Sequence, residues 1–226
     1  MFNENLNIVK KNISNALNKT GRSLEEIKLV AVSKTKPVEM ILEAYNLGLR
    51  DFGENKAQEL KTKVAELPKD INWHFIGHLQ TNKVKEVVQV AELIHSVDSI
   101  KIAGEINKRA RAIEKVQNIL IEVNTSEEDT KFGLSSIEQV KEIALFCTEA
   151  SNLNLYGLMT MAPFTDNKKI LRDCFIKLRE MKENLNYNGF NLKELSMGMT
   201  NDYEIAIEEG ATIVRIGTAL FGKRNY

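Results

Sequence analysis

The chain has 226 residues, 43% of them hydrophobic, and its 31 basic residues balance its 31 acidic ones. This length suits a single domain over residues 1–226 with a sizeable core, and the neutral charge excludes a surface built for nucleic acid or for anionic membranes. No apolar stretch approaches the roughly 20 residues of a membrane-spanning helix, and the N-terminus lacks a signal-peptide core, so we expect a cytoplasmic protein.

The first predicted element is a helix that precedes all the strands. Leu6, Val9, Ile13 and Leu17 recur at helical spacing, and Gly21 is a plausible end of this helix. Strand-like and helix-like segments then alternate to the end of the chain. The expected strands cover residues 28–34, 50–54, 72–77, 92–97, 117–124, 155–160, 193–197 and 212–217.

Helical patterns fill the gaps between these strands. Pro37 begins one helix, where its missing N–H costs nothing, and Gly48 ends it. Ser135 begins another helix with a predicted capping box to Glu138.

Eight strands separated by helices predict one closed (β/α)₈ barrel of the TIM type, with the first helix as an addition. A doubly wound open sheet is the alternative fold. Such sheets usually have fewer strands and often a glycine-rich first turn, and no G-x-G-x-x-G pattern occurs here. The pattern therefore favours the barrel.

Lys34 is the most informative single residue. It follows an aliphatic run, and side-chain alternation puts Val30, Val32 and Lys34 on the same face of the predicted strand. Burial favours the neutral form of an amine, and a neutral amine can form a Schiff base with an aldehyde. The alternative is that Lys34 simply extends into solvent where the strand ends.

Two turns near the end of the chain combine glycine with hydroxyl groups. Gly198 lies in the segment Ser196–Asp202 after the seventh strand, while Gly217 and Thr218 follow Arg215 at the end of the eighth. Barrels often bind phosphate with the loops after strands seven and eight, so these turns predict a phosphate site. The alternative is that both are tight turns without chemical meaning.

Other residue types that often carry chemistry offer less. Cys147 and Cys174 lie among apolar residues and are predicted to be small core residues. The three histidines lack metal-ligand spacing: His74 is expected in the core, whereas His78 begins a loop and could face a ligand. We therefore predict no metal site. The residues expected at the strand ends are mostly polar, namely Lys34, Asn55, His78, Asp98, Asn124, Thr160, Ser196 and Arg215.

Six motifs occur in order and together closely resemble the pyridoxal phosphate homeostasis proteins, small barrels related to the N-terminal domain of alanine racemase. They are AVSKTKP (31–37), FGEN (52–55), WHFIGHLQTNK (73–83), GLMT (157–160), SMGMT (196–200) and VRIGT (214–218). The resemblance runs from about residue 29 to residue 222. Two departures are Lys56, where an aromatic residue is expected, and Thr200 in place of serine.

The resemblance implies a role for each matching residue. Lys34 would hold pyridoxal 5'-phosphate as a Schiff base. Ser196 with the Gly198 turn, and Gly217 with Thr218, would hold the phosphate. Arg215 would face the pyridine nitrogen, and Asn55 would contact the cofactor.

The resemblance also implies a non-catalytic role in intracellular pyridoxal phosphate (vitamin B6) homeostasis, with apo-enzymes as transient recipients. The alternative is a pyridoxal-phosphate-dependent amino-acid racemase, which needs an acid and a base on opposite faces of the carbanion. Alanine racemase supplies a tyrosine for this purpose from a further C-terminal domain through dimerisation. The given sequence ends at Tyr226, so we expect a monomer without that second base; Tyr203 and His78 are the alternatives. A barrel enzyme for another phosphorylated substrate would keep the phosphate site but leave Lys34 without a cofactor.

Overall fold

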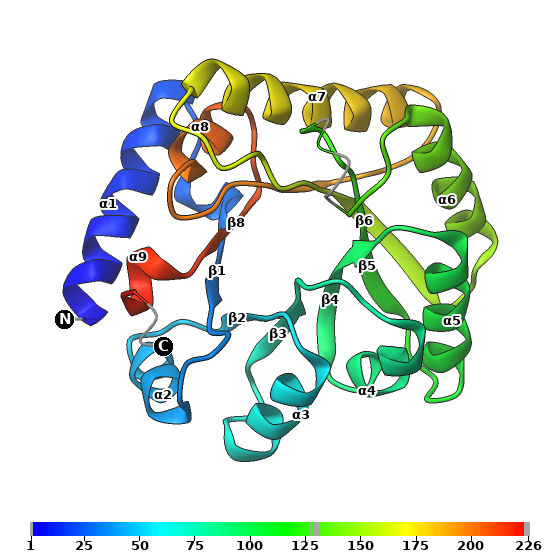
Figure 1. The fold of residues 1–226 in the computed structure, drawn as a ribbon, viewed down its shortest axis with the longest axis horizontal. Coiled ribbons are helices and arrows are strands. Elements are labelled where there is room, and N and C mark those ends of the chain that lie inside the picture. Colours follow the sequence, from blue (N-terminus) through cyan, green and yellow to red (C-terminus); the bar gives the residue numbers. More distant parts are fainter. Residues whose placement is uncertain (1, 127, 129–131, 224–226) are drawn as a thin grey trace.

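Eight parallel strands pair in sequence order and close into a barrel, as predicted (Figure 1). The structure is a computed structural model that describes residues 2–126, 128 and 132–223. The predicted strands are all present, but most end earlier than expected, and β1 stops two residues before Lys34. Their bounds are β1 (Lys28–Val32), β2 (Asp51–Glu54), β3 (Asn72–Phe75), β4 (Ala91–Val97), β5 (Gln117–Glu122), β6 (Leu153–Met159), β7 (Glu194–Ser196) and β8 (Ile213–Ile216).

Helices surround the strands, as Figure 1 shows. The α-helices are α1 (Phe2–Thr20), α2 (Val38–Asn46), α3 (Ala57–Glu66), α4 (Val84–Val88), α5 (Ile100–Arg111), α6 (Ile137–Glu149), α7 (Lys168–Tyr187), α8 (Tyr203–Glu208) and α9 (Thr218–Phe221), and the 3₁₀ turns are η1 (Leu24–Glu26) and η2 (Thr81–Lys83). The first helix ends before Gly21, which adopts a left-handed φ of 68°, as its sequence predicts.

The predicted cap of α6 is wrong by one residue. Ser136, rather than Ser135, accepts the helical N–H, with Gln139 as its capping-box partner in place of Glu138. Two serines stand side by side, and the one directly before Ile137, the first helical residue, takes the capping position. Only the helix register decides between them.

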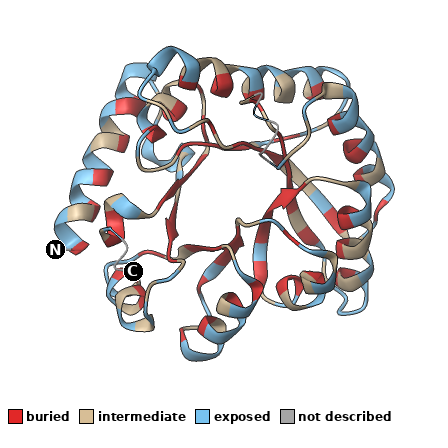
Figure 2. Cartoon of the chain, in the orientation of Figure 1, coloured by how far each residue is buried: buried red, intermediate tan, exposed pale blue. Residues whose placement is uncertain are grey.

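Two apolar cores lie on opposite sides of the sheet. A small inner core fills the barrel with Val30, Leu93, Leu120, Met159 and Ile213, and a larger outer core joins the strands to the helices. Figure 2 shows buried residues along the strands and exposed residues on the outer faces of the helices. Because Val30 faces inward, the same alternation directs residues 32 and 34 toward the barrel axis.

The N-terminal helix α1 packs against the C-terminal helices α8 and α9 (Figure 1). The rings of Phe2 and Phe221 lie 5.0 Å apart. The side-chain amide of Asn12 donates to the hydroxyl of Tyr203 at 3.0 Å. The additional helix therefore joins both ends of the described chain to the outside of the barrel.

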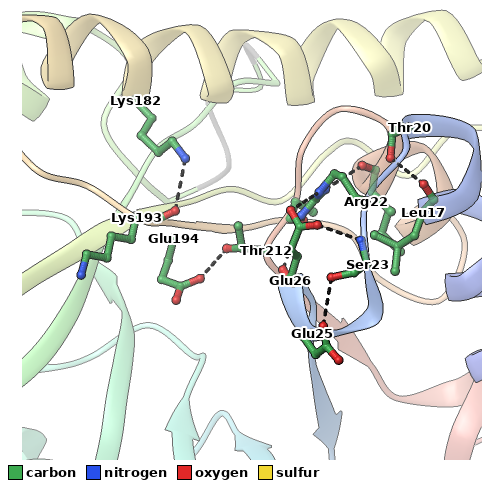
Figure 3. Close-up of polar contacts among 12 residues, drawn as sticks. Leu17, Thr20, Arg22, Ser23, Glu25, Glu26, Lys182, Lys193, Glu194 and Thr212 are labelled. Carbon is green, nitrogen blue, oxygen red and sulfur yellow. Dashed lines mark hydrogen bonds and ion pairs between the residues drawn. The ribbon is translucent and has the colours of Figure 1, made fainter.

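Polar contacts tie together the amino-terminal ends of the last strands, as Figure 3 shows in part. The hydroxyl of Thr212 donates to the carboxylate of Glu194, which begins β7. Arg22, which follows α1, donates to the carbonyl of Ala211 at 2.8 Å. These contacts close the mouth of the barrel that lies opposite the cavity described below.

Within the described residues, no helix has the length and apolarity needed to cross a membrane. Cys147 and Cys174 are buried, as predicted for small core residues. Among the same described residues, no three His, Cys, Asp or Glu side chains are grouped to hold a metal ion.

Candidate functional site

A cavity of about 260 Å³ lies at the carboxyl end of the barrel strands, where barrel active sites are found. Loops after β1, β6, β7 and β8 form its walls. Four of the seven predicted site residues line it, namely Lys34, Arg215, Gly217 and Thr218. The fold thus brings the predicted lysine and the predicted phosphate turn to one cavity.

The loop that carries Lys34 begins directly after β1 and has an unusual backbone. Lys34 is partly buried and lines the cavity, so the alternative that it merely extends into solvent is not observed. Thr35 adopts a φ of +64°, a left-handed conformation that is uncommon for residues other than glycine. Such a conformation persists only where surrounding contacts hold it in place.

A buried ion network supplies these contacts. Lys63 of α3 donates to the carbonyl of Ser33 at 2.8 Å and to the carboxylates of Glu54 and Glu59 at 2.7 Å each. Glu54 also accepts from the Ser33 hydroxyl at 2.6 Å, and Glu59 accepts from the Thr35 N–H at 2.6 Å. The residues on both sides of Lys34 are therefore hydrogen-bonded to one charged cluster.

Lys36 is the nearest other amine in sequence, but its side chain points elsewhere. Its Nζ donates to the carbonyls of Phe221 and Gly222 at 3.1 and 3.3 Å, at the end of α9. Lys36 is not among the residues that line the cavity. Lys34 is accordingly the amine of this loop that can meet a ligand there.

The turns after β7 and β8 form one continuous wall. The Thr200 hydroxyl accepts from the Ala219 N–H at 3.2 Å and so links the two turns. Gly198 has a φ of +94°, and a Cβ there would lie 2.6 Å from the Cβ of Ala206, so packing against α8 requires this glycine. A Cβ on Gly217 would meet only Val32, at 3.5 Å, and packing therefore does not require glycine at that position.

Arg215 places a buried cation in the wall of the cavity. Its guanidinium donates to the carbonyl and hydroxyl of Ser196 at 2.8 and 2.6 Å, and to the carbonyl of Thr160 at 2.8 Å. Burial lowers the pKa of Arg215 to about 10, with Asp202 and Glu122 acting in the opposite direction. The guanidinium thus keeps its charge at neutral pH.

Ser196, Gly198 and Asn55 lie outside the lining of this cavity. The Ser196 hydroxyl is fully buried and contacts His95 and Arg215. Asn55 lines a neighbouring cavity of about 290 Å³ together with His78.

His74 and His78 occupy different surroundings. His74 lies in the core with hydrogen-bonded ring nitrogens, as predicted. His78 lies in the cavity of Asn55, where it stacks on Phe132 with ring centroids 4.1 Å apart and approaches Asp98 at 3.4 Å.

Glu122 is a feature of the barrel interior that the sequence analysis overlooked. It ends β5, shares the inward parity of Leu120 in the inner core, and is only 3% exposed. Burial, together with the charge of Asp98, raises the pKa of Glu122 to about 7, with Arg215 opposing the shift. The alternation that located Lys34 would also have located this carboxyl group.

Comparisons with known proteins agree with this geometry. The family description "Alanine racemase, N-terminal domain" matches residues 5–225. A pyridoxal phosphate homeostasis protein of Aquifex aeolicus is 48% identical over 99% of this chain and 98% of its own length. One from Pseudomonas aeruginosa is 42% identical over 99% of this chain and 96% of its own length. The structure of PipY from Synechococcus elongatus with PLP bound is 33% identical, has a TM-score of 0.82, and is matched over 93% of this chain and 100% of that one.

The buried ion network leads to a prediction about stability. Replacing Lys63 with methionine leaves Glu54 buried without its cation, which costs about 3–5 kcal/mol of unfolding free energy. Urea denaturation at pH 7 measures this loss. Lys61→Met, an exposed position on the same helix, should change stability by less than about 0.5 kcal/mol. Equal effects of the two substitutions would contradict the role of the network.

Glu122 leads to a prediction about pH. A carboxyl group whose pKa rises on folding stabilises the protein below its unfolded pKa of 4.5, and this contribution disappears as pH rises through about 7. Glu122→Gln should therefore stabilise the protein at pH 8 by about 2–3 kcal/mol and should have little effect near pH 4.5. Denaturation curves at both pH values test this, and a gain that does not depend on pH would refute it.

Proposed function

Because the chain belongs to the alanine racemase N-terminal domain family and to the pyridoxal phosphate homeostasis proteins, we propose that it binds pyridoxal 5'-phosphate and serves in the homeostasis of this cofactor. The observation that carries the proposal is the position of Lys34 in the same cavity as Arg215, Gly217 and Thr218. The relative whose structure contains the bound cofactor has the same barrel, which supports the proposal further.

The residues of the cavity fit the chemical groups of this cofactor. The amine of Lys34 would condense with the aldehyde, with loss of water, to form a Schiff base. Hydroxyls of Thr200 and Thr218 and the open backbone at Gly217 would hold the phosphate. Bound pyridoxal phosphate supplies an electron-withdrawing ring, and the protein decides how far that property is used.

Arg215 would limit the use of that ring. We propose that its guanidinium faces the pyridine nitrogen, where a permanent cation disfavours protonation of the ring. A neutral ring withdraws electrons less strongly, so it stabilises carbanions less. This arrangement suits storage and delivery of the cofactor better than racemisation, in agreement with the homeostasis name that the relatives carry.

The remaining predicted site residues would act from nearby positions. Gly198 shapes the turn behind the phosphate wall, and Ser196 contacts Arg215 from beneath it. Asn55 would reach the cofactor from the neighbouring cavity.

We also propose that the protein works as a monomer in the cytoplasm and passes the cofactor to apo-enzymes. The balanced charge of the chain and its content of only two cysteines support the location.

Visible absorbance tests the binding proposal. Protein saturated with pyridoxal phosphate should be yellow, and Lys34→Ala should abolish the absorbance of the lysine-linked cofactor. Lys36→Ala is the matched control and should retain it, because the Lys36 amine points toward the end of α9. An unchanged spectrum in Lys34→Ala would overturn the proposal.

The two glycines of the phosphate wall should respond differently to substitution. Gly217→Val places a side chain beside the cavity and should weaken pyridoxal phosphate binding at least tenfold, with a small loss of stability. Gly198→Ala should destabilise the fold by roughly 1–3 kcal/mol, because its backbone is left-handed and Ala206 is too close. Fluorescence titration and urea denaturation distinguish the two effects, and equal behaviour would contradict the assignment.

A further inference from the structure

A chain of hydrogen bonds runs through the barrel from Arg215 at the cavity to Asp51 at the beginning of β2. Arg215 Nη1 lies 2.6 Å from Ser196 Oγ, which lies 2.8 Å from His95 Nδ1. His95 Nε2 lies 2.9 Å from His74 Nδ1, and His74 Nε2 lies 3.0 Å from Asp51 Oδ1. Ser196, His95 and His74 are completely buried, so solvent does not compete for these bonds.

The arginine end fixes the direction of the chain. A guanidinium can only donate, so the Ser196 oxygen accepts from Arg215. The Ser196 proton is then available for His95 Nδ1, which accepts it. A neutral imidazole that accepts at Nδ1 carries its proton on Nε2, so His95 donates to Nδ1 of His74. His74 in turn carries its proton on Nε2 and donates to Asp51.

The aspartate end requires the same direction. An ionised carboxylate only accepts, so His74 must present an Nε2 proton to Asp51. Burial by itself raises the pKa of Asp51, but the hydrogen bond and charge of His74, with the charge of Lys28, bring it below its usual value. Burial lowers the pKa of both His74 and His95, which keeps the two rings neutral.

We infer that Ser196, His95, His74 and Asp51 are positioning residues that hold the Arg215 guanidinium in the cavity wall through a hydrogen-bond chain of one fixed direction. This inference rests on the proposed function, in which Arg215 faces the ring nitrogen of the cofactor. Since each neutral imidazole offers one donor and one acceptor, neither ring can reverse alone. The orientation of Arg215 thereby depends on a carboxylate at the opposite end of the barrel.

The protonated nitrogens can be read directly in the cofactor-free protein. Long-range ¹⁵N–¹H correlation spectra of ¹⁵N-histidine-labelled protein at pH 7 should show His74 and His95 as neutral rings protonated at Nε2. His78→Gln identifies the third histidine. A ring protonated at Nδ1 alone, or at both nitrogens, at position 74 or 95 would overturn the inference.

The positioning role is tested by breaking the chain beside Arg215. Ser196→Ala should shift the Nδ1 resonance of His95, weaken pyridoxal phosphate binding about tenfold and change the visible spectrum of the bound cofactor. Ser96→Ala is the matched control, because Ser96 is a buried serine whose hydroxyl donates to the Gly77 carbonyl at 2.5 Å, away from the chain. Equal binding by the two variants would refute the role.

Asp51→Ala tests the far end and does not require Ser196→Ala to fold. Loss of the terminal acceptor should allow an Nδ1-protonated population of His74 and His95 and should shift the cofactor spectrum in the direction seen for Ser196→Ala. Unchanged ring resonances would show that no such chain exists. If the wild-type protein bound no pyridoxal phosphate, the proposed function would fail, while the resonances of the cofactor-free protein would still decide the chain.

Discussion

The pairing of β1 with β8 is the constraint on which both the fold and the site depend. In this register Val30 lies opposite Arg215 and Ala31 lies opposite Ile216, so the pairing closes the barrel between segments far apart in sequence. Beyond these pairs, the two strands lead directly into the loop of Lys34 and the turn of Gly217. A shift of one residue would turn Lys34 or Arg215 away from the barrel axis. The inner core therefore determines both the barrel and the meeting of an amine with a cation.

The loop of Lys34 shows how the barrel places a reactive amine at a defined position. Thr35 adopts a costly backbone conformation, and Lys63 with two carboxylates holds the residues on either side of Lys34. A buried ion network contributes little net stability compared with an apolar cluster of the same size. We interpret its value here as geometric, since it leaves the loop one arrangement in which the Lys34 amine reaches the cavity.

The sequence predicted the barrel because aliphatic runs separated by helical patterns are local signals that repeat eight times. It also predicted the position of Lys34, because side-chain alternation extends two residues beyond the strand. The Ser136 cap could not be predicted, since adjacent serines are locally equivalent. Lys63 was missed because its partners become neighbours only when α3 packs on the strands.

Ser196 shows where family resemblance and local pattern are insufficient. Its position beside Gly198 favoured a direct phosphate contact, whereas the structure places its hydroxyl between Arg215 and His95. Strand alternation offered a usable signal, because His74 and His95 are histidines on adjacent strands with inward parity. The hydrogen bonds between them depend on barrel closure and the stagger of the strands, which no single segment encodes.

The most direct measurement of the central claim is chemical. Borohydride reduction of the protein loaded with pyridoxal phosphate, followed by peptide mapping, should find the phosphopyridoxyl group on the ε-nitrogen of Lys34. Recovery of the group on another lysine, or of unlabelled protein, would contradict the account of this site.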